Sequence, residues 1–217
     1  MAKPKVSASI LDADFLRLKE QIDAVVQDVD EIHLDVMDGV FVDNISFGPS
    51  IVSQVRAAYP EAFLDTHLMI SRPEAMWPPF QKAGSNVITF HYEVTPHSYI
   101  LCKHLREAGV GAGVVVTPAT DVGVLEPIKE YIDRVLVLTV EPGFGGQSFV
   151  RAMLRKIEKA RTLFGDDMDI QVDGGIKDST VSDTKNAGAN VFVAGSYIFG
   201  AEDPRERVLK LRDLVGA

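Results

Sequence analysis

The sequence predicts an α/β protein, a single (β/α)8 barrel that spans residues 1–217. Short apolar runs recur at intervals of about 20 to 30 residues, and a segment with helical periodicity follows each run. Several runs are nearly continuous valine, isoleucine and leucine, as in parallel strands covered on both faces. The length of 217 residues is close to typical for such a barrel, and no linker interrupts the chain. The alternative fold is a doubly wound open sheet.

We expect eight strands, each an apolar run bounded by glycine, proline or polar residues. In chain order they are residues 5–11, 31–38, 64–70, 86–93, 111–118, 134–142, 169–175 and 190–196. Eight helices alternate with these strands, and the clearest helical patterns cover residues 12–27, 96–108 and 148–164. The last helix begins at Asp203-Pro204, a capping residue followed by proline in the first turn.

Composition excludes several classes of function. A net charge of −9 and a pI near 5.0 argue against nucleic acid as a partner. No run of 18 apolar residues occurs, and the apolar run before Asp12 is too short for a signal peptide, so we expect no membrane partner. The single cysteine, Cys102, reads as a buried helix residue and suits the cytoplasm, where we expect the protein.

Polar residues gather where strands are expected to end, which is the catalytic end of such a barrel. His33 and Asp35 are two residues apart on one strand, so their side chains leave the same face. His67 and Asp173 stand near the ends of two other strands. Two imidazoles and two carboxylates from three strands predict one divalent metal site, suited to Zn²⁺, Fe²⁺, Mn²⁺ or Co²⁺. Each residue alone would more simply be a hydrogen-bonded structural residue.

Three other polar residues near strand ends receive no metal-binding role. We interpret Asp38 and Asp65 as turn or loop-edge residues. His91 also lies near a strand end, but it has no partner at a suitable spacing, so we interpret it as structural or as support for the site.

Three glycine-bearing segments follow the last three expected strands: EPGFGGQ at 141–147, DGGI at 173–176 and AGS at 194–196. Glycines let backbone N–H groups approach a phosphate, and the loops after strands 7 and 8 often form such a site. This mode of binding suits an acidic protein, because it uses amides rather than lysines. Each glycine alone would more simply be a turn residue.

These motifs together resemble the ribulose-phosphate 3-epimerase family. The matching segments occur in order over essentially the whole chain, namely SILDADF, HLDVMDGVFVDN, DTHLM, TVEPGFGGQSF, VDGGI and AGSYIF. The resemblance implies a barrel of the ribulose-phosphate-binding type with one divalent metal. The implied reaction is the interconversion of D-ribulose 5-phosphate and D-xylulose 5-phosphate.

The resemblance also implies roles for individual residues. The metal ligands would be His33, Asp35, His67 and Asp173, and the catalytic acid/base pair would be Asp35 and Asp173. The residues that contact a small-molecule sugar phosphate would be Ser9, Met37, His67, Met69, Gly143, Phe144, Gly145, Gly146, Gly174, Gly175, Gly195 and Ser196.

Four positions depart from the family pattern. Asp43 stands where proline is usual, Thr117-Pro118 replaces an asparagine-proline pair, Leu138 replaces a methionine, and Tyr197 follows AGS where a small residue is common. None of these changes removes a proposed ligand or acid/base group. Thr117 and Tyr197 bear on which sugar is preferred.

Three other functions are considered. A 3-epimerase of another ketose phosphate, such as allulose 6-phosphate, would use the same chemistry. A lyase or decarboxylase of this fold would carry a DxKxxD motif, whereas the second strand reads DVMDG without lysine. A non-catalytic phosphosugar-binding barrel would not need two facing acids. We also expect a homo-oligomer, with MWPPF at 76–80 as a candidate contact patch or as packing within the monomer.

Overall fold

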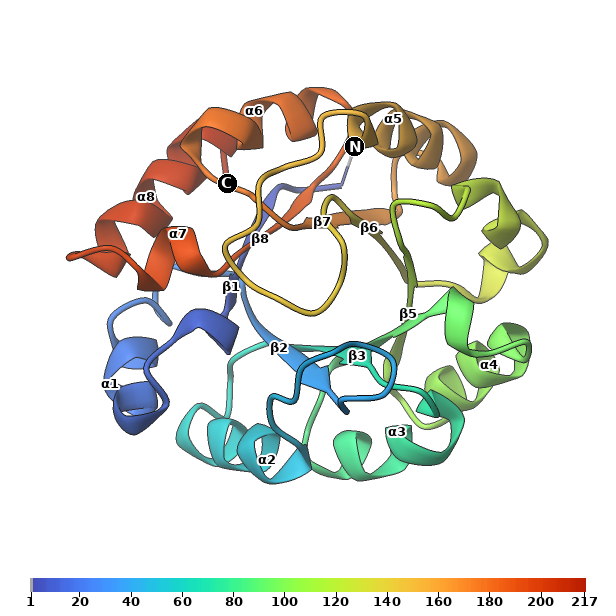
Figure 1. Ribbon diagram of the computed structural model, residues 1–217, viewed down its shortest axis with the longest axis horizontal. Coiled ribbons are helices and arrows are strands. Elements are labelled where there is room, and N and C mark those ends of the chain that lie inside the picture. The colour runs from blue at the N-terminus through green and yellow to red at the C-terminus, as the bar shows by residue number, and fades with distance from the viewer. Residues whose placement is uncertain (1) are drawn as a thin grey trace.

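The computed structural model describes residues 2–217 and confirms the (β/α)8 barrel. Within these residues, eight parallel strands pair in chain order and β1 closes onto β8, with the helices outside the ring (Figure 1). The strands are β1 (Lys5–Ser9), β2 (Glu31–Met37), β3 (Leu64–Met69), β4 (Val87–His91), β5 (Gly111–Val116), β6 (Arg134–Leu138), β7 (Asp169–Asp173) and β8 (Val191–Ala194).

The helices cover the outer face of the barrel. The α-helices are α1 (Leu18–Asp23), α2 (Pro49–Ala58), α3 (Pro73–Lys82), α4 (Ser98–Glu107), α5 (Met153–Phe164), α6 (Asp178–Asn186), α7 (Ser196–Phe199) and α8 (Pro204–Val215). Four 3₁₀ helices complete the shell: η1 (Ile10–Asp12), η2 (Phe15–Arg17), η3 (Tyr92–Val94) and η4 (Val122–Tyr131). No helix within residues 2–217 is long and apolar enough to cross a membrane.

The regular alternation of one α-helix per strand was partly wrong. The segment predicted as one helix over 12–27 is broken, because the Asp14 side chain accepts a hydrogen bond from Leu16 N at 3.0 Å and starts a separate 3₁₀ turn. The segment between β5 and β6 is the 3₁₀ helix η4, which contains Pro127 and therefore lacks one backbone donor. Two helices, α7 and α8, follow β8.

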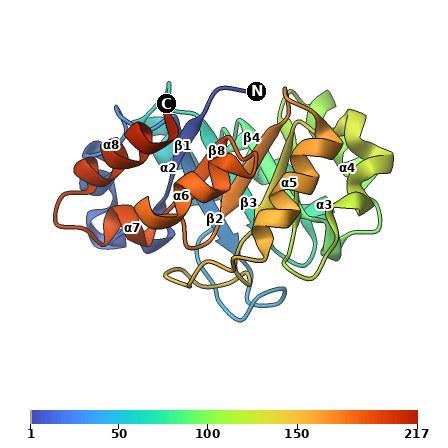
Figure 2. The same ribbon diagram turned by 90° about the horizontal axis from the view of Figure 1, so that it is seen from above.

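The ends of the last helix agree with the prediction. Asp203 caps α8 by accepting a hydrogen bond from Glu206 N at 3.2 Å, and Pro204 occupies the first turn. Gly216 ends the helix in the left-handed conformation, with φ of 67°. Figure 2 shows both termini at one end of the barrel and the loops 38–48 and 139–152 at the opposite end.

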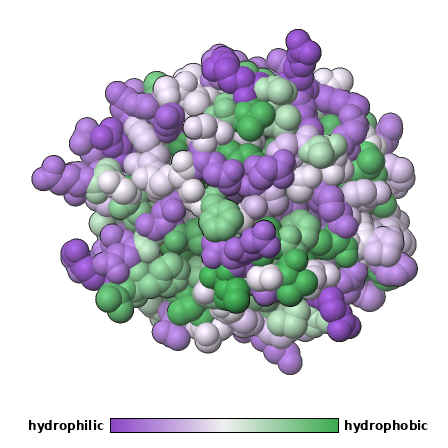
Figure 3. Space-filling model, viewed as in Figure 1, coloured by the Kyte–Doolittle hydropathy of each residue, from purple (hydrophilic) through white to green (hydrophobic). Residues whose placement is uncertain are grey.

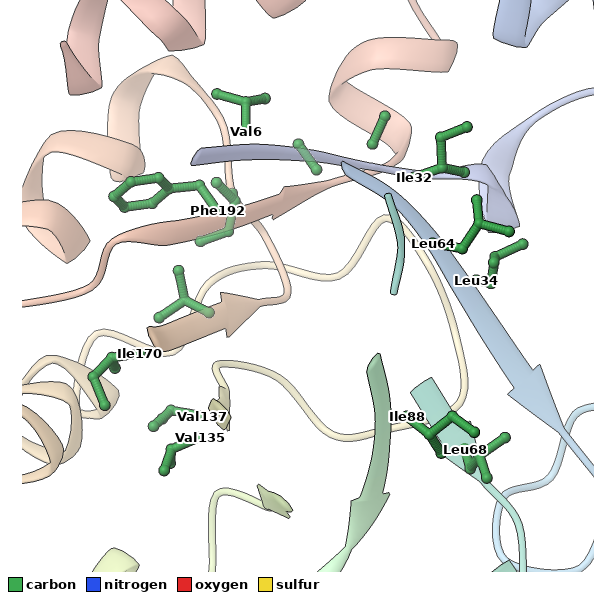
Figure 4. Close-up of a cluster of buried hydrophobic side chains, with 14 of the residues drawn as sticks. Val6, Ile32, Leu34, Leu64, Leu68, Ile88, Val135, Val137, Ile170 and Phe192 are labelled. Carbon is green, nitrogen blue, oxygen red and sulfur yellow. The ribbon is translucent and has the colours of Figure 1, made fainter. Parts of the chain in front are cut away.

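The apolar core lies between the strands and the helices. Strand residues that face outward are fully buried there, including Val6, Leu34, Ile88 and Phe192 (Figure 4). Cys102 of α4 belongs to this core, as the sequence indicated. The candidate patch 76–80 lies in α3. Phe80 is buried in the core, which agrees with packing within the monomer, whereas Met76 is exposed and is available for a contact between subunits.

Candidate active site

The four predicted metal ligands meet inside the barrel. His33 and Asp35 come from β2, His67 from β3 and Asp173 from the end of β7. One nitrogen or oxygen atom of each residue lies within 4.8 Å of the corresponding atoms of the other three. Strand register explains part of this proximity, because Asp35 pairs directly with His67 across β2 and β3. Both imidazoles are fully buried.

Asp35 is the centre of this group. Its Oδ1 lies 3.1 Å from His33 Nε2 and 2.9 Å from His67 Nδ1. Its Oδ2 accepts a hydrogen bond from Ser9 Oγ at 2.7 Å. The Asp173 Oδ2 atom is slightly farther from the imidazoles, at 3.9 Å from His33 Nε2 and 4.0 Å from His67 Nδ1. The four donor groups therefore face a common point.

The interpretation of Asp65 as a loop-edge residue was wrong. Asp65 lies inside β3 with a fully buried side chain, and its Oδ2 lies 2.7 Å from His33 Nδ1. The sequence held a signal for this position, since Asp65 and His67 share the same two-residue spacing as His33 and Asp35. Asp65 orients the His33 ring, as carboxylates do behind ligating histidines. The interpretation of Asp38 holds, because its carboxylate accepts backbone hydrogen bonds from Val40 and Phe41.

Asp65 also belongs to a buried charge network that the sequence analysis missed. Arg134 of β6 lies deeper in the barrel and donates to Glu31 Oε2 at 2.7 Å and to Asp169 Oδ2 at 3.0 Å. The Arg134 Nη1 atom lies 3.2 Å from Asp65 Oδ2, and Gln171 Nε2 donates to the same oxygen. Arg134 is 2% exposed, so these carboxylates neutralise a buried guanidinium.

His91 supports the other imidazole of the site. The Nε2 atoms of His67 and His91 lie 2.9 Å apart, so one of these two nitrogens carries the hydrogen of an N–H···N bond. His91 Nδ1 lies 3.5 Å from Glu93 Oε2, and Glu93 Oε1 accepts a hydrogen bond from Thr117 N at 2.8 Å. Thr117, one of the departures from the family pattern, thus binds the carboxylate that lies nearest to His91 Nδ1, although His91 Nδ1 itself forms no hydrogen bond within residues 2–217.

Burial and neighbouring charges drive the pKa values of the two aspartates apart. Burial alone would raise the pKa of Asp35, but the charges and hydrogen bonds of His33 and His67 outweigh it and hold this pKa well below its usual range. Burial and the charge of Asp35 raise the pKa of Asp173 to about 6. The pKa of Asp173 therefore lies above that of Asp35, so Asp173 takes up a proton more readily than Asp35 does.

The donor set fits a divalent cation. Two imidazole nitrogens and two carboxylate oxygens are ligands that Zn²⁺ and other first-row metals accept. Among residues 2–217, the ion pairs of Asp35 and Asp173 involve histidines and no lysine or arginine. A buried and a half-buried carboxylate side by side without a permanent cation are costly, and a dication at their common point would offset that cost.

A cavity opens from this group toward the mouth of the barrel. Asp35 and Asp173 line it together with Ser9 and with the apolar side chains Met37, Met69 and Leu138. Leu138 takes the place of the expected methionine and keeps the wall apolar. His33 and His67 lie beneath the cavity wall, where water cannot reach them.

Glycine-rich loops form the other side of the cavity. We call the residues predicted to hold the phosphate the glycine cradle, which comprises Gly143, Phe144, Gly145, Gly146, Gly174, Gly175, Gly195 and Ser196. The first six line the cavity, whereas Ser196 lines an adjoining groove with Gly146, Gly175 and Tyr197. Gly175 needs to be glycine, because its φ is 66° and a methyl group there would lie 2.5 Å from Phe149 N.

Two loops border the mouth of the cavity. Loop 139–152 carries Phe144 at its tip, and loop 38–48 carries Val40, Ile45 and Asp43. Phe144, Val40 and Ile45 are exposed, and so is Asp43. Figure 3 shows this face, where hydrophobic residues lie beside hydrophilic ones.

Known proteins match both the sequence and the fold. A family model described as "Ribulose-phosphate 3 epimerase family" matches residues 5–199. A ribulose-phosphate 3-epimerase of Candida glabrata is 42% identical over 99% of this chain and 94% of its own. A ribulose-phosphate 3-epimerase of Bacillus subtilis is 42% identical over 96% of this chain and 98% of its own. A crystal structure of 3-hexulose-6-phosphate synthase has a TM-score of 0.76 at 22% identity and covers 97% of this chain and 99% of its own, a likeness of fold alone.

Proposed function

Because this chain belongs to the ribulose-phosphate 3-epimerase family, we propose that it interconverts D-ribulose 5-phosphate and D-xylulose 5-phosphate. The enzyme is an isomerase that inverts the configuration at C3. The observation that carries this proposal is the pair Asp35 and Asp173, which reach one cavity from the non-neighbouring strands β2 and β7.

Inversion at C3 needs a base on one face of the carbon and an acid on the other. An ionised Asp35 or Asp173 removes the proton beside the carbonyl, and the other, protonated carboxyl group returns a proton from the opposite face. The pKa of Asp173 is raised and that of Asp35 is lowered, so Asp173 is the more readily protonated member of the pair. Because the two groups interact, they titrate as a pair, and their roles exchange with the direction of the reaction.

The metal would be held by His33, Asp35, His67 and Asp173. When bound, a divalent ion supplies Lewis-acid stabilisation for the enediolate that forms from the substrate. Asp65 and His91 hold the two imidazole rings in place from behind. Met37, Met69 and Leu138 exclude water from the reacting carbon, which strengthens the electrostatic interactions there.

The glycine cradle would hold the phosphate of the substrate through backbone amides. Ser9 would contact the sugar from β1 while its hydroxyl holds Asp35 Oδ2. The identity of the metal among zinc, iron, manganese and cobalt stays a prediction. A cytoplasmic location and a homo-oligomeric state also stay predictions.

The other functions receive less support. The similar 3-hexulose-6-phosphate synthase shares only the fold, and fold alone does not give the reaction. The second strand of this chain still lacks the lysine that a lyase or decarboxylase motif requires. A non-catalytic barrel leaves the two facing acids without a purpose.

The test is an epimerisation assay of metal-loaded and chelated protein, with D-ribulose 5-phosphate and allulose 6-phosphate offered in parallel. We expect metal-dependent turnover of the pentulose and entry of deuterium from D₂O at C3. Asp173→Asn should reduce turnover by at least roughly 10²-fold, because it removes a positioned acid/base group. Near-normal turnover of this variant with metal bound would sink the two-aspartate mechanism, and faster turnover of the hexulose would reassign the substrate.

A further inference from the structure

The Asp12 side chain lies among the backbone atoms of the glycine cradle. Asp12 ends η1, directly after β1, and lines the same cavity as Asp35 and Asp173. A methyl group built on Gly195 would lie 2.8 Å from Asp12 Oδ2, and one built on Gly145 would overlap the Asp12 carboxylate. Two glycines of the cradle thus have this carboxylate in the space that a side chain would fill.

Asp12 also faces a backbone donor that the cradle would offer to an anion. The Ser196 N–H group favours the ionised Asp12 carboxylate, although burial and the charge of Asp35 raise the pKa of Asp12 overall. Among residues 2–217, no lysine or arginine forms an ion pair with Asp12, and its neighbour Asp35 adds a further negative charge. The carboxylate therefore stands in the place of an anionic ligand, held by an amide rather than by a cation.

A phosphate dianion and this carboxylate cannot share the position. They would compete for the Ser196 amide, and their like charges repel each other strongly at such short range. Asp12 is exposed at its outer side, so its side chain can rotate toward water without repacking the core. Binding of a phosphate ester then includes the cost of moving Asp12. The apparent affinity equals the intrinsic affinity multiplied by the fraction of molecules in which the position is free.

We propose that Asp12 is a specificity-determining residue that occupies the phosphate position of the cradle and lowers the preference for phosphorylated ketoses. This inference rests on the proposed function, because it assumes that the cradle takes the phosphate of the substrate. A neutral ketose meets no repulsion, since a carboxylate accepts hydrogen bonds from hydroxyl groups. Asp12 therefore sets the ratio of kcat/KM for phosphorylated ketoses to kcat/KM for unphosphorylated ones.

The test compares the wild-type enzyme with Asp12→Asn and Asp12→Ser, which remove the charge and keep a small polar side chain. The expected result is a KM for D-ribulose 5-phosphate that falls roughly tenfold, with the change on KM rather than on kcat. The ratio of kcat/KM for D-ribulose 5-phosphate to that for unphosphorylated D-ribulose should rise by a similar factor. Asp43→Asn is the matched control, because it removes one negative charge from the exposed rim of the same mouth, and no atom of Asp43 is among those nearest to a side chain built on a cradle glycine.

Inorganic phosphate provides a second arm that does not depend on turnover. Its dissociation constant, measured by calorimetric titration, should fall roughly tenfold in Asp12→Asn and stay near the wild-type value in Asp43→Asn. An equal or weaker phosphate affinity in Asp12→Asn would overturn the inference and make Asp12 a group that orders Ser196. Absence of turnover in the wild type would instead contradict the proposed function, while the phosphate titration would still decide the role of Asp12.

Discussion

Replacement of Asp65 by asparagine tests whether the buried charge network supports the site. Asp65 is fully buried, lies 2.7 Å from His33 Nδ1 and forms an ion pair with Arg134 at 3.2 Å. Asp65→Asn keeps the shape and one acceptor oxygen but removes the charge. Breaking a buried ion pair from one side costs about 3–5 kcal/mol. Arg134 keeps its contacts with Glu31 and Asp169 in this variant. We therefore expect the free energy of unfolding to fall by about 3 kcal/mol, near the lower end of that range.

The assay is urea unfolding of the metal-free protein followed by far-UV circular dichroism, with Asp43→Asn as an exposed control. The pKa of Asp65 is held well below its usual range, since the charges of His33 and Arg134 outweigh the effect of burial. A lowered folded pKa contributes stability that is fully present above the unfolded value of about 3.9 and is lost as pH falls toward the folded value. The difference between wild type and Asp65→Asn should therefore shrink below about pH 4.

Two results would refute this reasoning. A loss of less than about 1 kcal/mol at pH 7 would mean that the carboxylate does not stabilise the buried cations. If the difference in free energy of unfolding between wild type and Asp65→Asn stayed constant from about pH 7 down to about pH 3, the ionised form of Asp65 would not be what stabilises the fold.

Three further predictions concern the site and the core. His91→Phe removes the partner of His67 Nε2, so we expect metal affinity to fall about 10–100-fold in competition with a chromophoric chelator, while the exposed control His97→Phe stays within twofold. Gly175→Ala would place a methyl group close to Phe149 N at a positive φ of 66°, so KM for D-ribulose 5-phosphate should rise and the thermal midpoint of unfolding should fall. An unchanged KM would contradict a role of Gly175 in substrate binding. Phe192→Ala leaves a cavity in the outer core and should lower the free energy of unfolding by about 3–5 kcal/mol in urea, and a loss below about 1 kcal/mol would contradict the packing described here.

Much of the fold could be predicted because strand periodicity is strong in this sequence. Runs such as residues 111–118 and 134–142 are continuous enough to identify buried parallel strands. The helices were harder, because local hydrogen bonds decide their limits. The cap made by Asp14 divides a segment with a continuous helical pattern, and Pro127 accompanies a 3₁₀ helix where an α-helix was expected.

The candidate site was predicted where two polar residues share a strand face. His33 and Asp35 were found by their spacing, and Asp65 was missed although it has the same spacing from His67. The contact between His67 and His91 links β3 and β4, so it depends on strand register rather than on local sequence. The position of Asp12 beside Gly145 and Gly195 likewise depends on how three distant segments meet at the barrel mouth.

The charge network of Arg134 also has a consequence for how the chain folds. Arg134 lies on β6, whereas Glu31 and Asp65 lie on β2 and β3, so the cation and two of its anions belong to different halves of the chain. A fragment that ends after β4 would have to bury Asp65 without this guanidinium, and a fragment that begins at β5 would bury Arg134 without two of its carboxylates. We therefore expect either half alone to be less stable than it is in the closed barrel, because its buried charges would lack their partners.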